Sequence, residues 1–136
     1  MSQPAAESPL QVLEQRNKAI LANDMQAFVD LFAEDGVIEM PFTAGELPAQ
    51  LAGKEAIRAY AIDTDRGGFL LDELQVRQTY RTDDPEVVIV ELTSVGRITS
   101  TDQPFQVPCI QVFRIRDGKI VLFRDYVGHA FLPDLS

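Results

Sequence analysis

The sequence predicts an α+β domain, in which three helices from the first half of the chain pack on the concave face of a curved antiparallel sheet. Three observations carry this prediction. Apolar residues recur at helical spacing over residues 8–62. From Leu74 onward the period changes, and Val, Ile, Thr and Phe become frequent, as is typical of strands. A length of 136 residues suits one domain, and helices followed by a strand meander are typical of the α+β class.

Two helices are expected near the start of the chain. Ser8-Pro9-Leu10-Gln11 combines an N-cap serine with proline and glutamine at the first and third helical positions, so a helix begins there and runs to Leu21. Asp24 caps a second helix, which we expect to end at Asp35-Gly36. The apolar stripe of that helix consists of Met25, Phe28, Val29 and Phe32. Residues 1–7 are small and polar and are predicted to be a disordered tail, which leaves 8–136 as the domain.

The rest of the chain predicts mostly strands. A short strand is expected over 37–42, stopped by Pro41, then a loop over 43–52 and a third helix from Gly53 to Ile62. Longer strands are expected over 74–81, 86–98, 105–115 and 120–127, separated by turns rich in Asp, Ser, Pro and Gly. Such a sheet cannot close against three short helices without leaving a hollow. The sequence therefore predicts a cone-shaped domain with an internal apolar pocket.

Composition excludes several classes of function. A net charge of −9 argues against binding to nucleic acid or to an anionic membrane surface. One cysteine excludes an internal disulfide, and one histidine argues against a conventional zinc site. No apolar run reaches the ~18 residues of a membrane span, and no secretory signal is visible, so we expect a cytoplasmic protein. Four acidic residues flank a Gly-Gly loop without a metal-ligand pattern and are expected to be solvated: Asp63, Asp65, Asp72 and Glu73.

Three stretches together resemble the nuclear transport factor 2-like superfamily. They are Asn23-Asp24-Met25 through Pro41-Phe42, Gly53-Lys54-Glu55-Ala56-Ile57-Arg58, and Val112-Phe113-Arg114 through Phe123-Arg124-Asp125-Tyr126. The branch is similar to the SnoaL-like group, which includes polyketide cyclases, ketosteroid isomerases, limonene-epoxide-hydrolase-like enzymes and phenazine-biosynthesis A/B-type proteins. The resemblance implies a conical, usually dimeric fold with an apolar pocket. The fold hosts many reactions, so it implies no single one.

Carried over residue by residue, the resemblance argues against two of these reactions. Where ketosteroid isomerases have a catalytic Tyr, a general-base Asp and a protonated Asp, this chain has Arg16, Met40 and Gln111. Epoxide hydrolases of this fold use an Arg-x-Asp pair on one strand and a further Asp on the last strand. Ser94 and Gly96 stand at the two positions of the pair. The further Asp is matched by Asp125.

Phenazine-type and cyclase-like members resemble the chain more closely at this last position. They carry an acidic residue in an Arg-Glu/Asp-Tyr/Phe run, here Arg124-Asp125-Tyr126, as the candidate acid/base. They commonly continue with Asn-Pro, where this chain has Gly128-His129.

Asp125 is the candidate catalytic residue from the chemistry of its neighbours too, apart from the resemblance. Alternation along its strand places it with Val121, Phe123 and Val127, and an acid among apolar neighbours has a raised pKa that suits proton transfer near neutral pH. If the register differs, Asp125 is solvated or paired with an arginine. Gln111 shares an apolar strand face, so its amide needs a partner, which a ligand carbonyl, Ser94 or a backbone group would supply.

Other candidates have a weaker basis. His129 lies beyond the last strand, where an exposed position competes with a place at the pocket rim. Tyr60 belongs to the apolar stripe of the third helix and either fills the core or bonds a ligand. We expect Arg16 to be a solvated helix residue and Cys109 to be a buried, inert thiol. The remaining expected pocket residues are Phe28, Phe32, Met40, Leu92, Ser94, Phe113, Phe123 and Val127.

One strand face also predicts an assembly. Pro108, Ile110 and Val112 lie opposite Gln111 on their strand, and an apolar outer face needs cover. A second copy of the chain is the simplest cover, which predicts a homodimer through the sheet.

The sequence therefore predicts an acid/base enzyme of secondary metabolism that needs no cofactor or metal. The expected reaction is cyclisation, isomerisation or dehydration of a hydrophobic polyketide- or terpenoid-like molecule. Asp125 would move the proton, while Gln111 and Tyr60 would orient polar substrate atoms. The alternative is a protein of the same fold that binds a small molecule, or assists a larger enzyme, without catalysis.

Overall fold

The computed structural model describes residues 8–42, 49–63 and 68–128. Its helical elements are α1 (Pro9–Leu21), α2 (Met25–Asp30), α3 (Lys54–Arg58) and the π-helical turn η1 (Ala59–Asp63). Its strands are β1 (Phe32–Glu39), β2 (Gln50–Ala52), β3 (Phe69–Arg81), β4 (Val87–Ile98), β5 (Pro104–Arg116) and β6 (Lys119–Val127). They form one curved sheet in the order β2-β1-β6-β5-β4-β3.

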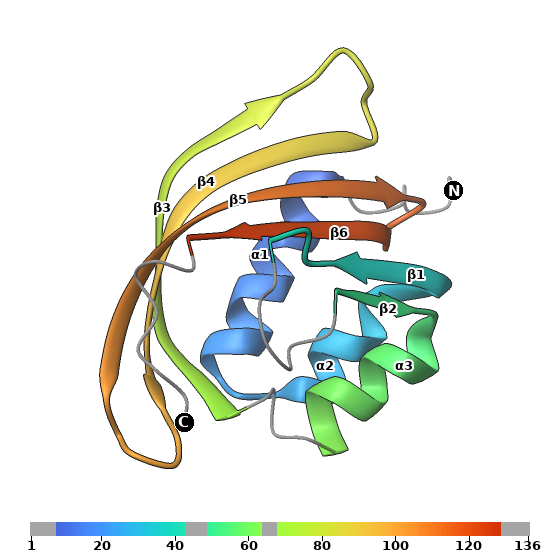
Figure 1. Ribbon diagram of the computed structural model, residues 1–136. Coiled ribbons are helices and arrows are strands. Elements are labelled where there is room, and N and C mark those ends of the chain that lie inside the picture. The colour runs from blue at the N-terminus through green and yellow to red at the C-terminus, as the bar shows by residue number, and fades with distance from the viewer. Residues whose placement is uncertain (1–7, 43–48, 64–67, 129–136) are drawn as a thin grey trace.

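The helices occupy the concave side of this sheet (Figure 1). The long strands β3, β4 and β5 bend around α1, which touches both β3 and β5, while α3 packs against β1 and β2. This arrangement confirms the predicted α+β class. The predicted tail over residues 1–7, the greater part of the predicted 43–52 loop, Asp65 and His129 lie outside the described residues.

The helix starts follow the predicted caps. Ser8 and Gln11 form a reciprocal capping box at the start of α1, and the Asp24 carboxylate accepts the Ala27 N–H at 3.1 Å at the start of α2. The third helix begins after Gly53, whose φ of 94° places it in the left-handed region that favours glycine. Local sequence therefore sets all three starts.

The end of the second helix differs from the prediction. The helix stops at Asp30, and Phe32, predicted to belong to its stripe, opens β1 and pairs with Ile120 of β6. The Phe28 and Phe32 rings still meet edge to face, 5.2 Å apart, so the spacing of these rings did not distinguish helix from strand. Tertiary pairing with β6 decides the backbone state here.

The sheet is mixed rather than purely antiparallel, because β1 runs parallel to β6. The chain also forms a short strand, β2, within the predicted 43–52 loop, and it pairs antiparallel with β1. From β3 to β6 the sheet is the predicted antiparallel meander, with β3 beginning at Phe69 rather than Leu74.

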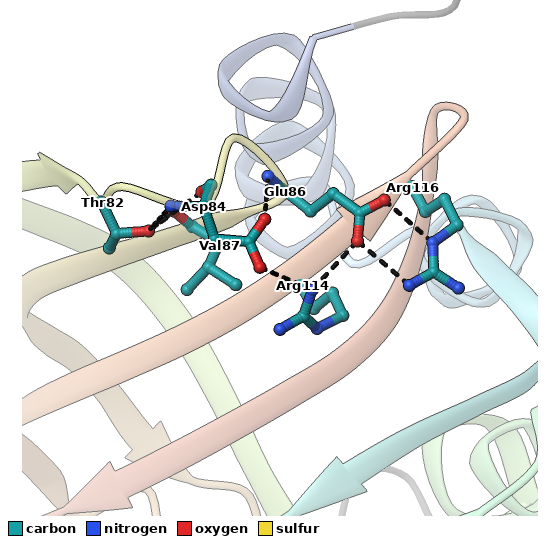
Figure 2. Close-up of polar contacts among 6 residues, drawn as sticks. All are labelled: Thr82, Asp84, Glu86, Val87, Arg114 and Arg116. Carbon is teal, nitrogen blue, oxygen red and sulfur yellow. Dashed lines mark hydrogen bonds and ion pairs between the residues drawn. The ribbon is translucent and has the colours of Figure 1, made fainter.

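An ion-pair cluster fastens the β3–β4 turn to β5 (Figure 2). Arg114 Nη1 lies 3.0 Å from both Asp84 Oδ2 and Glu86 Oε1, and Arg116 holds Glu86 through two N–H groups at 2.9 and 3.0 Å. These contacts lower the pKa of Glu86, mainly through Arg116, so the cluster is charged at neutral pH. No helix in the described part of the chain is long and apolar enough to cross a membrane.

Candidate active site

A cavity of about 200 Å³ lies between the helices and the concave face of the sheet. Every described helix and strand contributes to its lining, which is mostly apolar. Five polar side chains also line it: Arg16, Tyr60, Ser94, Gln111 and Asp125. A mostly apolar cavity with a few polar groups is the usual form of a small-molecule site.

Three of the polar residues form a continuous row from a cation to a carboxyl group. Arg16 Nη2 on α1 donates to Gln111 Oε1 on β5 at 2.9 Å, and Gln111 Nε2 donates to Asp125 Oδ1 on β6 at 3.3 Å. Gln111 and Asp125 are direct partners in the β5–β6 pair, so the sheet register brings them together. Arg16 and Gln111 are buried, whereas Asp125 is partly exposed to solvent and lines the cavity.

Asp125 is destabilised as an anion. Burial raises its pKa from 3.8 to about 6, although the Gln111 hydrogen bond and the Arg16 charge both act in the opposite direction. Loss of hydration therefore outweighs both stabilising contacts. Both protonation states of this carboxyl are populated near neutral pH, as acid/base chemistry requires.

The expectation that Arg16 is solvated is wrong. Its side chain is only 2% exposed, and its guanidinium lies over the rings of Phe113 and Phe123, with Cζ 4.9 and 5.4 Å from their centroids. Burial lowers the pKa of Arg16 to about 10, which still leaves it a cation at neutral pH. Its Nε has no hydrogen-bond partner among the described residues. The ring faces supply the cation with an electrostatic environment that an aliphatic core would not.

Cys109 is the buried thiol that the sequence predicts. Its sulfur lies 3.8 Å from Ser94 Oγ, and burial together with the nearby Asp125 raises its pKa to about 12. A thiol that stays protonated at neutral pH is a poor nucleophile. Ser94, one of the partners expected for Gln111, contacts Cys109 instead. The hydrogen-bond partners of Gln111 are Arg16 and Asp125.

The structure brings most of the predicted site residues to the cavity but not all of them. The residues it places in the lining are Tyr60, Phe28, Met40, Ser94, Gln111, Phe123, Asp125 and Val127. Phe32, Leu92 and Phe113 are each at most 2% exposed and belong to the hydrophobic core, and they do not line the cavity. Asp125 shares its face with Phe123 and Val127, as alternation predicts, while Arg124 turns away to Glu39 at 3.0 Å.

Sequence reasoning missed the role of Arg16 in this row. The signal was present, because Arg16 follows Val12 by four residues and precedes Ile20 by four, and both are buried. An arginine within an apolar stripe faces the core and needs an acceptor there. Among the described residues, no group of three or more His, Cys, Asp or Glu side chains could hold a metal ion.

The chain is similar to known proteins over most of its length. The family model described as a SnoaL-like domain matches residues 13–123. The uncharacterised protein YesE of Bacillus subtilis is 33% identical over 79% of this chain and 72% of its own. The uncharacterised PhzA/B-like protein PA3332 of Pseudomonas aeruginosa is 32% identical over 76% of this chain and 72% of its own.

Solved structures share the fold. A candidate isomerase from Bacillus subtilis is 30% identical, with a TM-score of 0.79 over 87% of this chain and 84% of that one. A candidate polyketide cyclase from Streptomyces antibioticus is 21% identical (TM-score 0.72; 92% of this chain, 95% of that one). Protein RV0760c of Mycobacterium tuberculosis, solved with estradiol-17beta-hemisuccinate, is 23% identical (TM-score 0.75; 88% and 94%). At these last two identities the likeness is one of fold.

Proposed function

The chain belongs to the SnoaL-like family, and we propose that it is an acid/base enzyme of small-molecule metabolism that acts on an apolar substrate. One observation carries the proposal. Asp125 lines a mostly apolar cavity beside Gln111, with its pKa raised to about 6 by burial. A carboxyl group kept in this state serves as a general base above pH 6 and as a general acid below it.

The lining indicates how a substrate would lie. Gln111 donates to Asp125 Oδ1, so we assign proton transfer to Oδ2 and expect the apolar body of the substrate to fill the rest of the cavity. An apolar cavity of about 150 Å³ accepts a benzene ring, so a cavity of this size suits a compact ring system. Cyclisation, isomerisation and dehydration of polyketide- or terpenoid-like molecules all require such a proton transfer. The steroid conjugate bound by the Mycobacterium tuberculosis neighbour supports an apolar ring system as ligand.

Binding without catalysis is the second candidate, and one observation favours it. Asp125 is the sole carboxyl group among the described residues that line the cavity. A reaction that needs separate acid and base groups would have to draw the second from elsewhere, or reuse Asp125 for both steps. Catalysis and binding can be separated by experiment.

The test measures by NMR how fast compact cyclic ketones, offered as substrates, exchange hydrogen for deuterium from the solvent. We expect the wild type to accelerate exchange α to the carbonyl, with a rate that rises through about pH 6 as Asp125 ionises. Asp125→Asn should lose at least about 100-fold of this rate while still binding the ketone. Glu14→Gln, an exposed change on α1, is the control and should keep the wild-type rate.

Two results would contradict the proposal. Binding of ketones without exchange by the wild type would favour the binding protein. Equal exchange by the wild type and Asp125→Asn would remove Asp125 from the mechanism.

We also propose that two copies associate through the convex face of the sheet. Side chains along β5 alternate between exposed and buried, and Ile110 on the outer face is 47% exposed. Pro108 and Val112 lie on the same face, so the outer side of β5 presents an apolar row. Burial of such a row in a two-fold interface is the usual way to remove it from water.

A further inference from the structure

The direction of the Gln111 amide is determined by chemistry alone. A guanidinium only donates hydrogen bonds, so the Gln111 oxygen must face Arg16. The amide NH₂ then faces Asp125, where an ionised carboxylate accepts it. If the amide were reversed, its NH₂ would meet the donors of Arg16 and its oxygen would meet the carboxylate.

From this row we infer that Arg16 is a positioning residue, which acts through Gln111 to orient Asp125 and to support its ionised form. The inference rests on the proposed function, because it gives Arg16 a part in the same reaction. Arg16 lies on α1 and Asp125 on β6, and the structure contains no direct ion pair between their described side chains within 4.0 Å. Two hydrogen bonds link them through the Gln111 amide.

The cost of burying Arg16 supports a role beyond packing. Its side chain is 2% exposed, its Nε lacks a partner among the described residues, and its charge sits in a cluster of aromatic rings. Replacement of a buried ionic group by an apolar side chain of similar volume often leaves stability unchanged or increases it. A methionine would fill the same space between α1 and the sheet, so packing alone does not require the guanidinium.

The other described polar and titratable groups that line the cavity beside Asp125 carry no positive charge, so the effect of Arg16 can be measured separately. Cys109 from β5 and Tyr60 from η1 also line the cavity, and burial raises the pKa of the Cys109 thiol to about 12. Ser94 from β4 is uncharged. In the described lining, Arg16 is therefore the cation whose removal should shift the titration of Asp125.

The experiment is a double-mutant cycle read by the carboxyl titration of Asp125. The full chain, labelled with ¹³C at the Asp carboxyl carbons, is titrated by NMR as wild type, Arg16→Met, Gln111→Met and the double variant, with Asp125→Asn assigning the signal. We expect each single change to raise the titration midpoint by about one pH unit. The double variant should fall short of the sum, because Gln111→Met already removes the part of the Arg16 effect that passes through the amide, while the Arg16 charge also acts on Asp125 across space. Lys18→Met removes an exposed charge from the same helix and should leave the midpoint in place.

Three results would overturn the inference. They are an unchanged midpoint in Arg16→Met, strictly additive shifts in the double variant, or an equal shift in Lys18→Met. If Arg16→Met does not fold, Gln111→Met alone decides, and a midpoint equal to that of the wild type rejects the link. The titration needs no turnover, so loss of the proposed function would appear separately, as absence of deuterium exchange.

Discussion

At the scale of single residues, the site depends on an acid that the fold makes costly to ionise. The pKa of Asp125 is about 6 in the folded chain and 3.8 as an ordinary side chain, because burial removes water from the carboxylate. Between these pH values the folded state binds more protons than the unfolded state. The free energy of unfolding therefore falls as pH rises through this window. Above pH 6 the folded state bears the full loss of stability that comes from ionising the buried carboxyl group.

Asp125→Asn should therefore stabilise the protein at alkaline pH. The asparagine keeps an oxygen for the Gln111 N–H but carries no charge, so it avoids a cost on the order of 3 kcal/mol at pH 8. Thermal unfolding at pH 8 and pH 4 measures this. We expect a higher Tm than the wild type at pH 8 and no such advantage at pH 4. Equal Tm differences at both pH values would mean that Asp125 is solvated in the folded chain.

At the scale of elements, the β5–β6 register brings Gln111 and Asp125 together, and β4, the strand on the other side of β5, requires a close approach from β3. A Cβ added at Gly96 would lie 2.1 Å from Leu70 O and 2.9 Å from Phe105 Cζ. One of these contacts is with backbone, which cannot rotate away. Glycine at this position therefore lets β3 and β4 pair beside the cavity wall.

Gly96→Ala should destabilise the fold by about 2–3 kcal/mol, because the two strands must separate to admit the methyl group. Urea unfolding of the two proteins measures the change. Ser100→Ala, in the exposed turn after β4, is the control and should shift stability by less than about 0.5 kcal/mol. A Gly96→Ala protein as stable as the wild type would mean that the backbone at this position has more room than the structure shows.

Local sequence was sufficient for some elements and insufficient for others. The caps at Ser8 and Asp24 and the strands β4 to β6 follow from side-chain chemistry within a few residues, and the structure confirms them. The switch at Phe32 depends on β6, almost ninety residues later, so periodicity could not show it. For Arg16, the spacing to Val12 and Ile20 does indicate burial, but its partner Gln111 lies 95 residues away, so no local pattern identifies that contact.

At the scale of the whole molecule, the fold separates two surfaces. The concave side of the sheet holds the helices and the cavity, and the convex side carries the ion-pair cluster and the apolar row of β5. The strand faces alternate, so one strand supplies both Gln111 to the cavity and Ile110 to the outside. A partner on the convex face would leave the cavity lining unchanged.

The proposed dimer predicts a mass in solution of two 15.1 kDa chains, measured by light scattering during size-exclusion chromatography. Ile110→Glu places a charge in the proposed interface and should shift the protein toward one chain. Val76→Glu, at another exposed apolar position on β3, is the matched control. A wild type with the mass of a single chain at micromolar concentration would contradict the dimer.

The proposed chemistry depends most on the protonation state of one carboxyl group, and the titration of Asp125 by ¹³C NMR in the wild-type full chain measures that state directly. The signal is identified by its absence in Asp125→Asn. We predict a midpoint near pH 6, the result of a carboxyl that burial keeps from water. A midpoint at or below the ordinary value of about 3.9 would show a solvated or ion-paired group and would contradict Asp125 as the acid/base of this site.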